Sequence, residues 1–344
     1  MPHPDMQKTH IKRSSYKYII LAATIIAALA GSMLYSKCQP KQHIPTKAEL
    51  DSIARIDSAA LHVALITNED CLPLFYAKEA GLIDTTRLDV RLLAFDGRLD
   101  CDTASINGHA EVCYVDVARA ILMRKDSTYV HIFASLPSRQ TLIVTKKKNI
   151  SNLTSLKQRI VGLERHSASD YYSDMLLDSV KLQQEDIYRP QINSLYTRYT
   201  MVSNDQFEVA FLEEPYTSMA LKARHKKLWQ APKNGPQFAA LAINESALAS
   251  PERIEQTQLL VKAYDKAVEH LTTEPDTIAL KRVLTNIYKL SEKEIEAAKT
   301  MRPTRLGGID YNAIKTMRTW LIKRGRIKEN FTTDGLTTDK IKNK

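Results

Sequence analysis

The chain has little of what breaks up or loosens a polypeptide, because its 344 residues include only 10 glycines and 13 prolines. These counts exclude a fibrous or low-complexity protein, so most of the chain should fold. The glycine fingerprints of P-loop and Rossmann sites and the GxSxG turn of hydrolases are absent. The CxxC, HxxxH and EF-hand spacings are also absent, so we expect no cofactor and no metal ion. The length, with 44% hydrophobic residues, favours two lobes or domains with a large core.

An excess of charge of one sign is also missing from the body of the chain. The net charge of +10 comes from the two ends, since residues 1–43 contribute +5 and residues 315–344 contribute +6. Residues 44–314 carry 34 basic and 35 acidic side chains and are close to neutral. A nucleic-acid-binding protein needs its basic excess on the folded body. We therefore expect no nucleic-acid partner.

The N-terminal residues are typical of an export signal. Residues 1–17 form a basic segment, and residues 18–36 form an uncharged run just long enough to cross a bilayer. A basic segment before an apolar one orients the rest of the chain outside the cytoplasm. We expect the protein on the periplasmic side of the inner membrane, anchored by residues 18–36. Signal cleavage at Ala28-Leu29-Ala30 and lipidation at Cys38 are the alternatives.

Strand and helix patterns alternate from about residue 60, after a polar linker over residues 37–57. Apolar runs predict strands at 62–68, 88–95, 111–115, 129–134, 142–145, 159–164, 207–212 and 238–244. Helices are predicted near 72–81, 100–108, 117–125, 170–180, 217–224, 251–272, 276–288, 291–300 and 310–325. Strands joined by helices predict an α/β protein with mainly parallel sheets and right-handed crossovers.

Polar side chains follow the predicted strands, where open α/β sheets bind their ligands. The candidate ligand-binding residues are Asn68, Glu69, Asp70, Asp116, Ser167, Ser169, Asp170, Tyr171, Glu214 and Tyr216. Acidic groups outnumber basic ones in these loops, so a neutral or cationic solute is favoured over an anion. For Asp100, Asp116 and Asp170 the alternative is that each only caps a helix. Asp102 is expected to face solvent.

Several segments in this order resemble a known family. They include LPLFYAKEAGLID, LTSLKQRIVGLERHSASDYYSDMLL, FEVAFLEEPYTSMAL, FAALAINESALASPERI and GIDYNAIKTMRTWLIKRGRI. The chain resembles the solute-binding proteins of ABC importers, in the subfamily of nitrate, sulfonate, taurine and thiamine-precursor binders. The likeness runs from about residue 60 to residue 327. Gln158 departs from the glycine usual in the family.

The resemblance implies a type 2 periplasmic-binding-protein fold, with a solute cleft between two lobes joined by a hinge. Lobe one would comprise residues 58–148 and 236–327, and lobe two residues 149–235. The basic tail over 328–344 lies beyond the likeness and is expected from its own residues to be solvated, with contact to acidic lipid head groups as the alternative. The resemblance further implies a non-enzymatic, monomeric protein that binds a small molecule and delivers it to an ABC permease and its ATPase.

Two alternatives to solute import remain open. A relative on the same fold, the thiamine-pyrimidine synthase, would require a cysteine-rich motif that the sequence lacks. An envelope protein that binds a protein partner would have a cleft filled by side chains. The cysteines leave a second choice open, because Cys71 and Cys101 each open a helix at the cleft rim. They form either a disulfide or two unpaired thiols, whereas Cys113 is expected to be a buried hydrophobe.

Overall fold

The computed structural model describes residue 57 and residues 59–341. The predicted basic segment, the predicted anchor and nearly all of the predicted linker lie outside the described residues. Within those residues, no helix has both the length and the apolar character needed to span a bilayer. The chain divides into two units, Met1–Asp57 and Ser58–Lys344, and the second contains every element named below.

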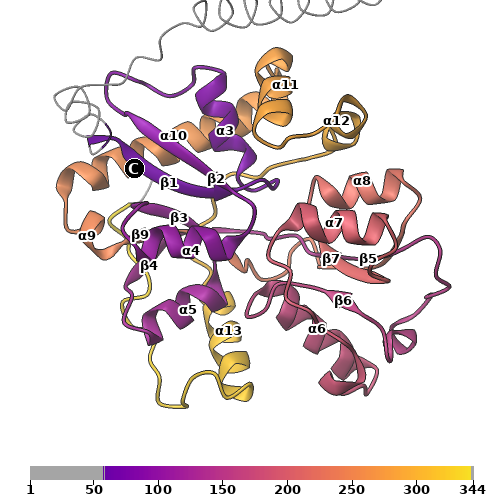
Figure 1. Cartoon of the computed structure of the whole chain (residues 1–344). Helices are drawn as coiled ribbons and strands as arrows, with labels where there is room; N and C mark the ends of the chain where they lie inside the picture. Colours follow the sequence, from indigo (N-terminus) through magenta and orange to yellow (C-terminus); the bar gives the residue numbers. More distant parts are fainter. Residues whose placement is uncertain (1–56, 58, 342–344) are drawn as a thin grey trace, which may run out of the picture. The chain divides into compact units, whose positions relative to one another are not determined.

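The first sheet has five strands in the order β2-β1-β3-β9-β4 (Figure 1). Its strands are β1 (Leu61–Ile66), β2 (Val90–Phe95), β3 (Val112–Asp116), β4 (Val130–Leu136) and β9 (Ala239–Asn244). β2, β1 and β3 are parallel, whereas β9 is antiparallel to both of its neighbours. Every residue of β3 and β4 is buried. Helices cover both faces of such strands, which explains their continuous apolar sequences.

The second sheet has four strands in the order β6-β7-β5-β8. They are β5 (Thr141–Val144), β6 (Val161–Gly162), β7 (Val209–Leu212) and β8 (Lys226–Gln230). β6 and β7 are parallel, and β5 is antiparallel to β7 and to β8. One strand in each sheet therefore runs against the others. β6 has two residues, shorter than the strand predicted at 159–164.

The helices alternate with these strands and then close the chain. Between strands lie α3 (Leu72–Glu79), α4 (Arg98–Ile106), α5 (Val117–Lys125), η1 (Leu153–Leu156), α6 (Ala168–Ser179), η2 (Gln184–Asp186), α7 (Leu195–Ser203) and α8 (Tyr216–Lys222). After β9 follow α9 (Glu245–Leu248), α10 (Pro251–Thr273), α11 (Thr277–Asn286), α12 (Glu292–Ala298) and α13 (Tyr311–Lys323). α13 packs against α5, beside the end of α6 (Figure 1).

The strand order creates a ligand position at the centre of the first sheet. α3 leads the chain from β1 out to β2, and α4 leads it back across β1 to β3. Right-handed crossovers in opposite directions lie on opposite faces of the sheet. The carboxyl ends of β1 and β3 therefore form a switch point, which is where open α/β sheets bind ligands.

Two short connections join the sheets, residues 137–140 between β4 and β5 and residues 231–238 between β8 and β9. Because β5 pairs in the second sheet, the chain leaves the first sheet before residue 141. The sequence put this boundary later, between residues 148 and 149. The sequence prediction places the return to lobe one at residue 236.

Capping residues and prolines in the sequence account for the ends of helices α3 and α10. Pro73 lies in the first turn of α3, and Gly81 follows its end with φ +65°, a conformation that glycine adopts without a steric penalty. The Ser250 side chain accepts a hydrogen bond from the Arg253 N–H and caps α10, with Pro251 as its first residue. These signals are local, and the sequence therefore revealed them.

The C-terminal tail is part of the fold, and the prediction of a solvated end is wrong. The Ile132 N–H donates to the Leu336 carbonyl at 2.8 Å, and the Thr338 N–H donates to the Ile132 carbonyl at 2.9 Å. Leu336 and Ile341 are buried. The tail thus forms backbone hydrogen bonds with β4, which is the edge strand of the first sheet. Without the tail these backbone groups of β4 would have no partner within the sheet.

We expect the interior strand β9 to tolerate the truncation of a buried side chain poorly. Ile243 in β9 is fully buried, whereas Ile278 at the start of α11 is 65% exposed. Ile243→Ala should lower the free energy of unfolding by about 2–5 kcal/mol, because it leaves a cavity in the core. Ile278→Ala should change it by less than about 0.5 kcal/mol. Urea unfolding followed by circular dichroism measures both values, and equal losses would contradict this description of the core.

Candidate functional site

Polar residues meet at the switch point as the sequence predicted. Asn68 and Asp70 follow β1, Tyr114 lies in β3, and all three are buried. The Tyr114 hydroxyl donates to Asp70 Oδ2 at 2.8 Å and accepts from Asn68 Nδ2 at 3.0 Å. Asp70 Oδ2 also accepts from the Ser138 N–H, which belongs to the first connection between the sheets. The site therefore begins at β1 and extends toward the second sheet.

Arg98 joins the two sheets at this point. It is the first residue of α4, and its side chain is only 2% exposed. Its Nη2 donates to both carboxylate oxygens of Glu213, at 2.6 and 2.9 Å, and its Nη1 donates to Glu164 Oε2 at 3.3 Å. Glu213 follows β7 and Glu164 follows β6. The Arg98 guanidinium, which begins a helix beside the first sheet, thus lies between two carboxylates that follow strands of the second sheet.

Gly97 lets α4 bring Arg98 this close. It occupies the N-cap position that the sequence assigned to Asp100, which instead lies in the first turn of α4. A Cβ on Gly97 would lie 2.9 Å from backbone atoms of Asn193, a residue of the second-sheet region. The helix therefore starts where only a glycine fits, and this start determines the depth that Arg98 reaches.

Glu213 is the most heavily hydrogen-bonded acid of the site. Besides Arg98, it accepts from Asn68 Nδ2 at 2.8 Å and from the Gln140 side-chain amide. Burial raises the pKa of a carboxyl, but Arg98 and the Asn68 amide hold the pKa of Glu213 below its ordinary value. Glu213 is therefore ionised, and with Arg98 it forms a buried ion pair.

These residues form what we call the central polar cluster. Its members are Asn68, Asp70, Arg98, Tyr114, Ser138, Gln140, Glu164 and Glu213. Burial, together with the nearby Glu213 and Glu69, raises the pKa of Asp70 to about 7. The cluster thus combines one buried ion pair with the Asp70 carboxyl, which keeps its proton to a higher pH than an ordinary carboxyl does.

Asp116, Ser167 and Ser169 lie beside the cluster and are used by the fold itself. Asp116 caps α5 through Ala118 N–H and also accepts from the Ala168 N–H of α6 at 2.7 Å, so it links the two sheet regions. Burial raises its pKa to about 7. The Ser167 and Ser169 hydroxyls both donate to the Glu164 carbonyl, and Ser167 caps α6.

The remaining predicted ligand residues point elsewhere. Glu69 pairs with Arg139 at 2.8 Å, and Glu214 accepts from the Ser218 N–H. The Tyr216 hydroxyl lies 3.1 Å from Thr67 Oγ1. Asp170 pairs with Arg189 at 3.2 Å, and the Tyr171 ring packs against Trp320 of α13. Of the ten predicted residues, the structure brings Asn68 and Asp70 into the cluster and sets Asp116, Ser167 and Ser169 next to it.

Arg198 is a site residue that sequence reasoning missed. It lies on α7, is fully buried, and none of its three guanidinium nitrogens has a hydrogen-bond partner among the described residues. Burial lowers its pKa, while Glu164 and Glu213 oppose that shift, so its charge lies near both carboxylates. Glu164 Oε1 also lacks a partner among the described residues. Leu195 and Val202, at helical spacing after the Ser194 cap, were the signal that could have revealed α7.

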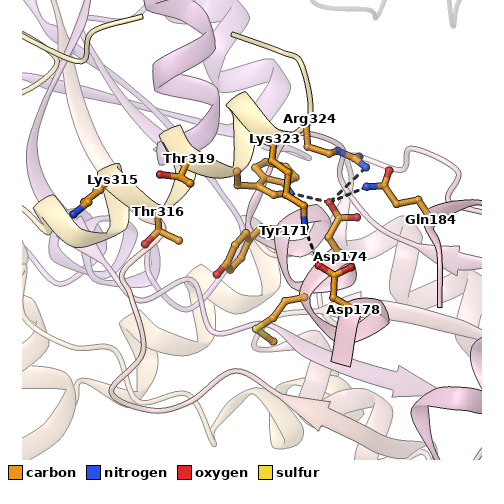
Figure 2. A pocket seen from close by; sticks show the side chains of 11 residues that line it. Tyr171, Asp174, Asp178, Gln184, Lys315, Thr316, Thr319, Lys323 and Arg324 are labelled. Carbon is orange, nitrogen blue, oxygen red and sulfur yellow. Dashed lines mark hydrogen bonds and ion pairs between the residues drawn. The ribbon is translucent and has the colours of Figure 1, made fainter. Parts of the chain in front are cut away.

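A cavity of about 450 Å³ lies between α6 and α13 (Figure 2). Tyr171, Met175 and Trp320 give it an apolar side, and Lys315 and Thr316 line its far end. Asp174 accepts from the Trp320 indole N–H at 2.8 Å and pairs with Arg324 at 3.4 Å. These contacts hold α13 against α6, and the cavity is distinct from the central polar cluster.

Cys71 and Cys101 are buried free thiols, so of the two alternatives left open for them the structure has the unpaired thiols. Cys113 is buried as expected, and burial raises its pKa to about 12. Asp102 is fully buried, not solvent-facing, because Arg119 pairs with it at 2.7 Å.

The raised pKa of Asp70 predicts a dependence of stability on pH. The folded protein keeps this proton up to about pH 7, whereas a carboxyl with the ordinary pKa of 3.8 loses it earlier. The stability from this group is complete below the unfolded pKa and is lost as pH rises through the folded pKa. Asp70→Asn stays neutral and can still accept both hydrogen bonds. Urea unfolding between about pH 4 and pH 8 should find it increasingly stable relative to the wild type.

The exposed Asp126→Asn is the control for this series, and its stability relative to the wild type should stay constant over the same pH range. If Asp70→Asn also follows the wild type at every pH, the raised pKa is contradicted.

Comparison with known proteins identifies the relatives of this fold. The family model described as "NMT1/THI5 like" matches residues 68–278. The alkanesulfonate-binding protein SsuA of Xanthomonas axonopodis pv. citri, bound to MOPS, has a TM-score of 0.68 at 14% identity. The alignment covers 81% of this chain and 98% of that protein. None of the curated proteins matches the chain.

Two further structures have the same fold. The ligand-binding component of an ABC-type import system from Staphylococcus aureus has a TM-score of 0.66 at 14% identity, covering 82% of this chain and 97% of that one. The nitrate-binding protein NrtA from Synechocystis PCC 6803 has a TM-score of 0.64 at 12% identity, covering 81% and 84%. The predicted type 2 periplasmic-binding-protein fold is confirmed. Because the family match spans more than half of the chain, the chain belongs to the NMT1/THI5-like family.

Proposed function

We propose that this protein is the extracytoplasmic solute-binding component of an ABC importer. In this proposal it binds a small polar solute between its two lobes and delivers it to a membrane permease. The observation that carries the proposal is Arg198, a fully buried guanidinium with no hydrogen-bond partner among the described residues. A buried charge without partners is costly, so the arrangement favours a ligand that supplies acceptors.

The same observation refines the expected solute. Arg98 already neutralises Glu213, and Arg198 adds a second positive charge that the sequence did not reveal. A purely cationic solute is therefore disfavoured, and we propose a neutral or zwitterionic one with acceptor atoms. A heterocycle with ring-nitrogen acceptors, such as a thiamine precursor, meets this requirement.

Closure of the lobes would use the two connections between the sheets. Residues 137–140 and 231–238 are the only described segments that run from one sheet to the other along the chain. Hinges of this kind absorb the rotation in a few residues, and the closed form is what the permease would recognise. The basic segment and apolar run at the N-terminus support a periplasmic location with a membrane anchor.

One observation favours a second candidate function. The Arg98 side chain fills the space between Glu164 and Glu213 with a group of the chain itself. A cleft filled in this way is what we expect of an envelope protein that binds a protein partner instead of a solute. The two candidates differ in whether any small molecule binds.

A thermal-shift screen of the full chain tests the proposal. The panel contains thiamine precursors, amino acids, amines, sulfonates and nitrate. We expect one neutral or zwitterionic compound to raise the Tm, since a ligand at 100 times its Kd stabilises the folded state by about 2.7 kcal/mol. Arg198→Gln should lose this shift, and Arg87→Gln, which changes an exposed arginine paired with Glu255, should keep it.

Other outcomes lead away from the proposal. No shift with any compound on well-folded protein would favour the partner-binding alternative. A bound compound that is chemically converted would favour the enzyme on this fold. A ligand-induced rise in Tm that is unchanged in Arg198→Gln would support solute binding but would contradict the proposed role of Arg198.

A further inference from the structure

We propose that Arg98 is an internal occupant of the cation position between Glu164 and Glu213, and that it determines specificity by excluding other cations from these two carboxylates. The inference concerns the site itself and holds for either candidate function. It explains how a site with several acids can still suit a ligand without net positive charge.

The surroundings of Arg98 provide carboxylates and an aromatic ring for a cation. One nitrogen, Nη2, donates to both oxygens of Glu213, and Nη1 donates to Glu164. The guanidinium carbon also lies 5.1 Å from the centre of the Tyr114 ring. Paired carboxylates beside an aromatic face are what proteins use to bind guanidinium and ammonium groups. The chain therefore provides both the groups that bind a cation and, in Arg98, the cation itself.

The pair also links the two lobes. Arg98 begins α4 beside the first sheet, while its two carboxylate partners follow strands of the second. Separation of the lobes would withdraw the guanidinium from Glu164 and Glu213 and expose both carboxylates to solvent cations. Arg98 and a free cation would then compete for one position, and the tethered group has the advantage of a high effective concentration.

The test removes the Arg98 side chain and supplies free guanidinium ion from solution. Arg98→Ala leaves Glu213 and Glu164 without their cation, so its Tm should fall. Millimolar guanidinium chloride, compared with sodium chloride at equal ionic strength, should restore part of that Tm. Isothermal titration should give the variant a guanidinium affinity at least roughly tenfold above that of the wild type. Arg87→Ala, which removes an exposed arginine, should gain no such response.

A double variant keeps the test valid if Arg98→Ala folds poorly. Arg98→Ala/Glu213→Gln removes both members of the main pair, so it should be more stable than Arg98→Ala and should not respond to guanidinium. Equal guanidinium responses of the wild type and Arg98→Ala would overturn the inference. A response that persists in the double variant would overturn it too, as would a folded Arg98→Ala that ignores guanidinium. None of these outcomes depends on whether the wild type binds a solute.

Discussion

The structure depends on one buried ion pair, between Arg98 and Glu213. Removing two charges from water costs several kcal/mol per ion unless each finds its partner with good geometry. Here the guanidinium reaches both carboxylate oxygens of Glu213, and Asn68 and Gln140 satisfy the remaining acceptor capacity. Because one member comes from each sheet region, the pair is satisfied only when the two regions are together. The ion pair thereby favours the arrangement in which the two sheet regions meet.

The rest of the site follows from this constraint. The switch point brings Asn68 and Asp70 next to Tyr114, which orients the Arg98 guanidinium. Asp116 makes a second link between the sheet regions by accepting the Ala168 N–H at the start of α6. Arg198 is the exception, since it shares the electrostatic surroundings of Arg98 without a partner of its own among the described residues. We regard that difference as the mark of a ligand site next to a structural ion pair.

Much of this could be predicted from the sequence, and the failures have physical causes. Strand runs, helix caps and the switch-point rule are local or topological, so they placed Asn68, Asp70 and Asp116 at the ends of β1 and β3, where the structure has them. The pairing of Arg98 with Glu213 joins residues 115 positions apart, and no spacing in the sequence reveals it. Arg198 was missed together with its helix. The tail was misjudged because its charges outnumber the two apolar residues, Leu336 and Ile341, that anchor it.

A double-mutant cycle on Arg98 and Glu213 tests the central claim most directly. Urea unfolding of the wild type, Arg98→Ala, Glu213→Gln and the double variant gives the coupling free energy between the two side chains. We predict a coupling of at least about 1.5 kcal/mol, with the double variant losing much less stability than the sum of the single changes. Single changes that add within about 0.5 kcal/mol would mean that the two groups do not depend on one another, and would contradict the account.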